Sequence, residues 1–92
     1  MITLAPTFHN RVLRELRRAV GSLGRFEFHA GPRPLFTDDA ATGERVSSRE
    51  PTDDELERLV DGVEPDLPEG AGYWRLLDNG GIVLMQGDSA DG

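Results

Sequence analysis

The sequence predicts an α+β protein with an N-terminal amphipathic helix, a small antiparallel β-sheet or sandwich with a C-terminal hairpin, and one short inserted helix. Three observations lead to this class. Apolar residues recur at helical spacing near the N-terminus, polar and apolar residues alternate after Gly24, and Asn79-Gly80 separates two apolar runs. With 92 residues and 37% hydrophobic content, residues 1–92 should form a single domain that buries only about 60–65% of its unfolded surface. Oligomerisation would therefore help to stabilise it.

The first element is a helix within residues 1–23, expected from about Thr7 to Val20. Thr7 can cap its start, and Gly21 or Gly24 can end it. One face carries the apolar residues Phe8, Val12, Leu13, Leu16, Ala19, Val20 and Leu23. The opposite face carries Arg11, Arg14, Arg17 and Arg18. This basic face is open to three interpretations: a solvated surface, a surface paired with the chain's own acidic half, or a binding face for an acidic partner or nucleic acid.

Residues 24–48 are expected to be β-rich. In the segment 25–30 the alternation predicts a strand with Phe26 and Phe28 on a buried face and Glu27 and His29 on a polar face. Gly31-Pro32-Arg33-Pro34 stops this strand. A second short strand is predicted over residues 44–48.

The clearest helix start lies in residues 52–62. Thr52 is the expected N-cap, and Glu55 completes a capping box. Gly62 should end the helix. Its buried side should carry Leu56, Leu59, Val60 and Val63.

Residues 72–87 are predicted to form a β-hairpin with Asn79-Gly80 at the turn, where both central positions can adopt positive φ. In that register, one face holds Trp74, Leu76, Val83 and Met85. The other holds Tyr73, Arg75, Leu77, Ile82 and Leu84. Because both faces are largely apolar, one should be covered by another layer or by a neighbouring subunit. Residues 88–92 are expected to be a mobile tail.

The charge is divided between the two halves of the chain. Residues 1–37 hold six arginines and two acids, a charge of +4, and residues 38–92 hold four arginines and fifteen acids, a charge of −11. The acidic total of −7 argues against direct nucleic-acid binding, because phosphates would be repelled. No apolar run approaches the length of about 18 residues that a membrane span requires, so the sequence predicts a soluble protein made in the cytoplasm.

No residue pattern predicts catalysis, a cofactor or a bound metal. The chain has no Cys and no Gly-x-Ser-x-Gly motif, and neither His9 nor His29 has a second ligand at metal-binding spacing. The compact acidic pairs, Asp38-Asp39 and Asp53-Asp54, are explained by a loop and by the first turn of a helix. Asp78-Asn79-Gly80 resembles the start of a calcium loop but lacks the later acidic ligand. We therefore expect a non-enzymatic protein.

One cluster of residue types is typical of interfaces. Tyr73, Trp74 and Arg75 are adjacent, and exposed side chains of these types often dominate binding energy. A single Trp in a small domain is more often a core residue, so both interpretations are kept. The residues predicted to contact a partner are Tyr73, Trp74, Arg75, Leu77, Ile82, Leu84, Arg14 and Arg18.

Three motifs occur in an order that resembles a diffuse family of small structural proteins of tailed bacteriophages and prophages. They are Phe28-His29-Ala30-Gly31-Pro32-Arg33-Pro34, Ala40-Ala41-Thr42-Gly43 and Gly72-Tyr73-Trp74-Arg75-Leu76-Leu77-Asp78-Asn79-Gly80-Gly81. The similar proteins begin with an amphipathic helix and end with a strand, a turn and a strand. This chain departs from them in the middle, where a helix from Thr52 to Asp61 replaces further strands.

The resemblance implies a virion component that is present in many copies and acts by contact with other virion proteins, such as capsid or tail subunits. The expected function is that of a non-enzymatic structural protein, a capsid decoration or accessory protein or a head–tail component, assembled in the host cytoplasm. We also expect it to form a homo-oligomer. The alternative is a small acidic cytoplasmic interaction module, an inhibitor or adaptor, that binds a basic protein.

Overall fold

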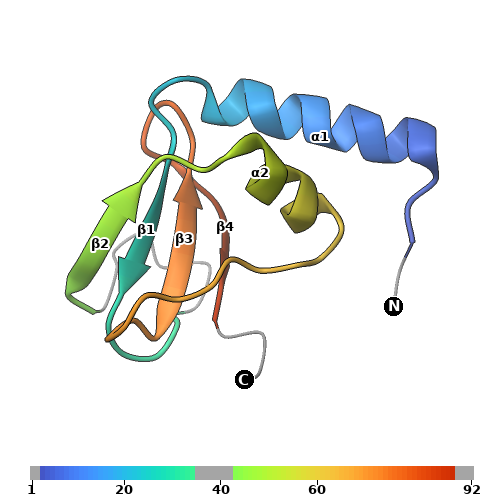
Figure 1. The fold of residues 1–92 in the computed structure, drawn as a ribbon. Helices are drawn as coiled ribbons and strands as arrows, with labels where there is room; N and C mark the ends of the chain where they lie inside the picture. The colour runs from blue at the N-terminus through green and yellow to red at the C-terminus, as the bar shows by residue number, and fades with distance from the viewer. Residues whose placement is uncertain (1–2, 35–42, 89–92) are drawn as a thin grey trace.

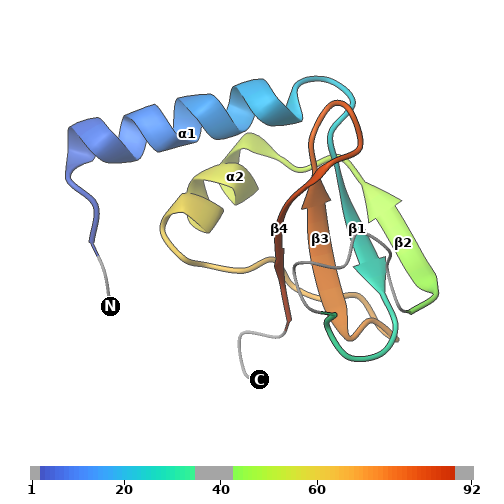
Figure 2. The ribbon, with the colours of Figure 1, turned by 180° about the vertical axis from the view of Figure 1, so that it is seen from behind.

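A computed structural model describes residues 3–34 and 43–88 of the chain. Its elements are α1 (Pro6–Val20), β1 (Arg25–His29), β2 (Arg45–Arg49), α2 (Asp53–Val60), β3 (Tyr73–Leu77) and β4 (Val83–Gly87). The four strands form one antiparallel sheet in the order β2-β1-β3-β4, which confirms the α+β class (Figure 1). Seen from both sides, α1 packs beside α2 and extends well beyond the sheet (Figure 2).

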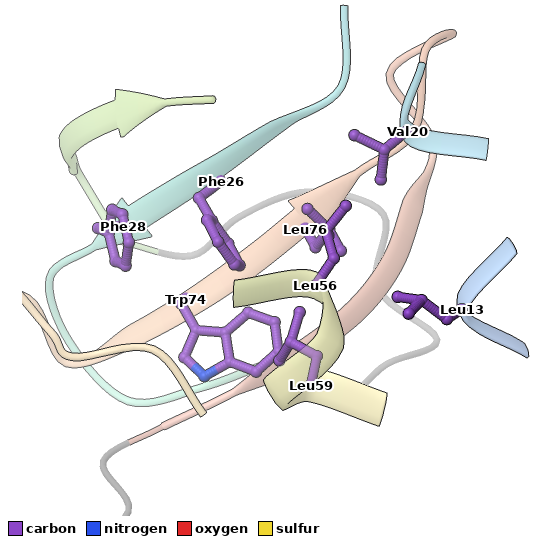
Figure 3. Close-up of a cluster of buried hydrophobic side chains, with 8 residues drawn as sticks. All are labelled: Leu13, Val20, Phe26, Phe28, Leu56, Leu59, Trp74 and Leu76. Carbon is purple, nitrogen blue, oxygen red and sulfur yellow. The ribbon is translucent and has the colours of Figure 1, made fainter. Parts of the chain in front are cut away.

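The core lies between one face of the sheet and the two helices. Cross-strand pairing places Phe26 beside Leu76 and Phe28 beside Trp74, so all four side chains share a face. The Phe26 and Trp74 rings meet edge to face with their centroids 5.7 Å apart. Onto this face α2 and α1 add four buried side chains, Leu56, Leu59, Leu13 and Val20 (Figure 3).

Helix α1 begins one residue earlier than the sequence indicated, and the prediction of a Thr7 cap is wrong. Pro6 occupies the first turn, where its fixed φ and missing N–H carry no penalty, and the N-cap Ala5 makes no side-chain cap bond. The predicted apolar stripe is also too wide. Phe8 and Leu23 are 48% and 66% exposed, because Phe8 is near the projecting end of α1 and Leu23 lies beyond its end.

Helix α2 confirms the predicted capping box. The Thr52 side chain accepts a hydrogen bond from the backbone N–H of Glu55, and the Glu55 carboxylate accepts one from the backbone N–H of Thr52. Gly62 follows the helix with a φ of +84°. Val63 is 50% exposed, so its predicted place on the buried side is wrong.

The hairpin forms with Asn79-Gly80 at the centre of its turn, but the positive φ predicted for these two residues is wrong. A positive φ occurs at Gly81 and not at Asn79 or Gly80. The N–H of Gly81 bonds the carbonyl of Asp78, and the N–H of Asp78 bonds the carbonyl of Ile82, which defines a three-residue loop. The Asp78 carboxylate accepts bonds from the N–H groups of Gly80 and Ile82, each at 2.8 Å, and so favours the longer loop.

A shift in strand register moves Val83 to the other face from the one predicted. Leu76 pairs with Met85, whereas Leu77 pairs with Val83, so the two pairs are separated by a bulge. One extra residue inverts the facing of all side chains on one side of it. Val83 therefore shares a face with Leu77 and not with Trp74 and Leu76.

The sheet face turned away from the helices is also buried in part. His29, Tyr73 and Arg75 are 4%, 0% and 4% exposed. The expectation that β1 has only one buried face is therefore wrong at His29, and the predicted covering of the second face of the hairpin is found within the chain at Tyr73 and Arg75. Residues 35–42, which include Asp38-Asp39 and most of the Ala40–Gly43 motif, and residues 89–92 of the predicted tail lie outside the described part of the chain.

Candidate interaction surfaces

The predicted contact residues fall into a buried group and an exposed group. Tyr73, Trp74 and Arg75 are buried in the chain, so a partner does not reach these side chains in this conformation. Trp74 lies in the core and donates its indole N–H to Glu64 Oε1 at 3.2 Å. The core interpretation of this Trp is therefore confirmed.

The remaining predicted contacts lie nearer the surface. Leu77 is half-buried, and Leu84 is half-buried against the core. Ile82 is 65% exposed, and both Arg14 and Arg18 are exposed on α1. A contact with a partner stays a prediction for these residues.

Two exposed apolar side chains lie on segments that are hydrogen-bonded to each other, the end of α1 and the hairpin loop. Asn79, in the hairpin loop, donates its N–H to the carbonyl of Ala19 at 2.8 Å and accepts a bond from the N–H of Leu23 at 3.2 Å. This clamp docks the hairpin loop onto the end of α1. Leu23 and Ile82, at 66% and 65% exposure, consequently lie on two segments joined by hydrogen bonds. The sequence did not reveal this pairing, because Leu23 follows the helical repeat of α1.

Described residues of the three motifs quoted in the sequence analysis, including Gly43 of the Ala40–Gly43 motif, meet at one corner of the sheet. The N–H of Gly72 bonds the carbonyl of His29 at 2.7 Å, and the N–H of Gly43 lies 3.5 Å from the Tyr73 hydroxyl. A Cβ at Gly43 would collide with the Ala30 carbonyl, and one at Gly72 would collide with the Gly31 carbonyl. Gly43 and Gly72 are therefore required by close backbone approach.

His29 is the most constrained polar group at this corner. Its Nδ1 lies 3.1 Å from the Gly43 carbonyl oxygen, and its Nε2 lies 3.1 Å from Glu27 Oε1. Both partners are acceptors, so the two bonds coexist when both ring nitrogens carry a proton. The ring stacks on Tyr73 with 5.2 Å between centroids, and Arg45 lies 3.6 Å from the other oxygen of Glu27. The side chains of this cluster contact one another, so we interpret the cluster as stabilising this corner of the fold.

A second polar cluster joins β2 to α2. Arg49 donates two hydrogen bonds to the Glu55 carboxylate, at 2.7 and 2.6 Å, and its guanidinium lies 5.3 and 5.4 Å from the Phe26 and Phe28 ring centres. The hydrogen bonds from Arg49 lower the pKa of Glu55 to about 2, against the opposing effect of burial. They also raise the pKa of Arg49. This clamp stabilises the fold and covers the edge of the aromatic core.

The described residues contain no group of three or more histidines and acids placed to hold a metal ion. Asp53 lies in the first turn of α2, and Asp78 is engaged by its own turn. A cleft of about 250 Å³ lies between the end of α1 and the start of α2, but its lining residues Arg17 and Asp53 already form an ion pair at 3.7 Å. It is smaller than most ligand sites. Among the described helices, none is long and apolar enough to cross a membrane.

Comparison of the chain with protein-family models, with curated proteins and with solved structures returns no significant match.

Proposed function

We propose that the chain is a non-enzymatic structural protein of a tailed-bacteriophage virion. Its place would be that of a capsid decoration or accessory protein or of a head–tail component, acting through contacts repeated over many copies. The observation that carries this proposal is that Gly31, Gly43 and Gly72, one glycine from each of the three motifs on which the resemblance depends, lie at one corner of the sheet. Motifs that are far apart in the sequence but build one corner of the sheet indicate a shared local structure more strongly than short matches alone.

The exposed surface supports a protein that acts by contact. Arg14 and Arg18 are exposed on α1, and Leu23 and Ile82 expose apolar area at the opposite end of that helix from its N-terminus. The partners would be other virion proteins and further copies of the chain. Under this proposal the protein is assembled in the host cytoplasm, binds no cofactor and acts on no substrate.

Mass spectrometry of purified particles from a host that carries the gene tests the proposal. The expected result is a fixed ratio between this chain and the major capsid or tail protein, retained after density-gradient purification. Absence of the chain from particles would refute it. Recovery instead with a basic cytoplasmic protein would support the alternative of a small acidic inhibitor or adaptor, and the position of the gene relative to capsid and tail genes gives an independent check.

A further inference from the structure

The outer faces of the two helices carry the same spacing of charges with opposite signs. Each face has charged residues at positions i, i+3, i+4 and i+7, which lie on one side of a helix. On α1 the four are Arg11, Arg14, Glu15 and Arg18, and on α2 and its C-cap they are Asp54, Glu57, Arg58 and Asp61. All eight are exposed. We call these the α1 stripe and the α2 stripe.

The two helices lie side by side and antiparallel (Figure 1). His9 bonds Asp61 at 2.8 Å, and Arg17 lies 3.7 Å from Asp53. In both contacts the two residue numbers add up to 70, so residue n of α1 is level with residue 70 − n of α2. The buried side chains Leu13 and Leu56 point to the core, which leaves both stripes on the outer surface of one helical layer.

We infer that this layer is the contact surface between two copies of the chain. A two-fold axis parallel to the helices places α1 of each copy over α2 of the other. The two facing helices are antiparallel, and every residue keeps its height along the axis, so residue n of α1 faces residue 70 − n of α2 in the other copy. Such an interface is isologous, so every contact occurs twice. The other in-plane axis places α1 over α1 and sets arginine against arginine, which charge repulsion disfavours.

At these heights, the arginines of the α1 stripe in one copy lie near the acidic residues of the α2 stripe in the other. Arg18 is level with position 52 of the other copy, two residues from Asp54, and Arg14 is level with position 56, one residue from Glu57. Arg11 is level with position 59, two residues from Asp61. Offsets of one or two residues are about 1.5–3 Å along a helix, which an arginine side chain spans.

Apolar side chains at one end of the layer add to the contact. Phe8 is 48% exposed and precedes His9, and Val63 is 50% exposed and lies two residues after Asp61. The axis that pairs the stripes therefore brings Phe8 of each copy to the level of Val63 of the other. Within each chain Asp61 is engaged by His9 at 2.8 Å, whereas the other paired stripe residues form exposed pairs, Arg18 with Glu15 at 3.5 Å and Arg58 with Asp54 at 3.0 Å. Such pairs contribute little and leave the charges available.

Charge reversal on one stripe at a time tests the pairing. Arg14→Glu/Arg18→Glu and Asp54→Arg/Glu57→Arg should each be monomeric by sedimentation equilibrium at low salt, with the association constant reduced by about tenfold or more. An equimolar mixture of the two should form a 1:1 dimer, because each reversed stripe then faces a stripe of opposite sign in both halves of the interface. Arg25→Glu/Arg33→Glu is the control for Arg14→Glu/Arg18→Glu, with the same change of charge away from the helical layer, and should dimerise like the parent chain.

Three results would overturn the inference: a parent chain that stays monomeric at low salt, reversed variants that dimerise like the parent, or a mixture that fails to dimerise. Circular dichroism checks folding, and Glu57→Arg alone replaces the second variant if Asp54→Arg weakens the start of α2. The inference depends on the helical layer and not on the virion proposal. Failure of one therefore leaves the other standing, since the purified chain and purified particles are measured separately.

Discussion

Replacing Glu55 with glutamine should remove the ionic part of the junction between β2 and α2. The Glu55 carboxylate accepts two hydrogen bonds from Arg49 and one from the N–H of Thr52. Glutamine keeps the length of the side chain and an oxygen that can still close the capping box. The variant therefore isolates the charge of the Arg49–Glu55 pair from the cap.

The magnitude follows from the pKa of Glu55, which falls from 4.5 to about 2. A lowering of this size corresponds to about 3 kcal/mol at full strength. The Arg49 side chain is 44% exposed and that of Glu55 is 20% exposed, so solvent screens the pair. We therefore expect Glu55→Gln to lower the free energy of unfolding by about 1–2 kcal/mol at neutral pH.

The same pair predicts a pH dependence with a definite sign. The pKa of Glu55 is lower in the folded chain than in the unfolded chain. Its contribution is therefore complete above about pH 4.5 and is lost as the pH falls toward 2. The difference in unfolding free energy between the parent chain and Glu55→Gln should shrink over that interval.

Urea unfolding followed by the fluorescence of Trp74, the only Trp in the chain, measures this difference at a series of pH values. Asp54→Asn is the matched control, because it removes the exposed ion pair with Arg58 on the same helix, for which a loss of only about 0.3–0.5 kcal/mol is expected. The reasoning fails if Glu55→Gln is no more destabilising than Asp54→Asn, or if its effect is the same at pH 6 as at the acidic end of the series.

Three further outcomes are expected. Gly72→Ala should lower the free energy of unfolding by about 1–3 kcal/mol, because the added Cβ would collide with a backbone carbonyl. Gly80→Ala is the control and should not lower it, because a Cβ has room there. Equal urea midpoints for the two variants would contradict this. Asn79→Ala should cost about 1 kcal/mol and increase amide hydrogen exchange at Leu23, since its side chain accepts that N–H; unchanged exchange would show that the clamp is dispensable. Elemental analysis of protein purified without chelators should find no stoichiometric metal, and a stoichiometric ion would overturn the expectation of no metal site.

The parts of the fold that the sequence predicted are those fixed by local interactions. The capping box of Thr52 and Glu55 defines the start of α2, and its geometry needs only residues three positions apart. The alternation of Phe26 and Phe28 predicted the buried face of β1 for the same reason. Both signals depend on neighbours in the chain, so tertiary structure did not override them.

Local sequence signals did not predict the geometry of the hairpin turn or the facing of Val83. Asn79-Gly80 favours a two-residue turn, but the Asp78 carboxylate bonds two N–H groups of a longer loop, and the Asn79 side chain bonds the N–H of Leu23, 56 positions away. The second interaction belongs to the tertiary structure and has no local signal. The bulge next to Leu77 then moves Val83 to the opposite face, and the predicted faces of the hairpin changed with it.

The candidate surfaces divide in the same way. Exposure of Arg14 and Arg18 follows from helical periodicity, whereas burial of Tyr73 and Arg75 depends on what lies over the second face of the sheet. The charge pattern of the stripes was present in the sequence all along. The sequence does not show how the two helices are aligned. Two intrachain contacts, His9 with Asp61 and Arg17 with Asp53, establish that the helices are antiparallel and which of their residues lie at the same height. Under the proposed dimer, the α1 stripe of one copy would face the α2 stripe of the other, and the uneven charge along the chain would serve this pairing.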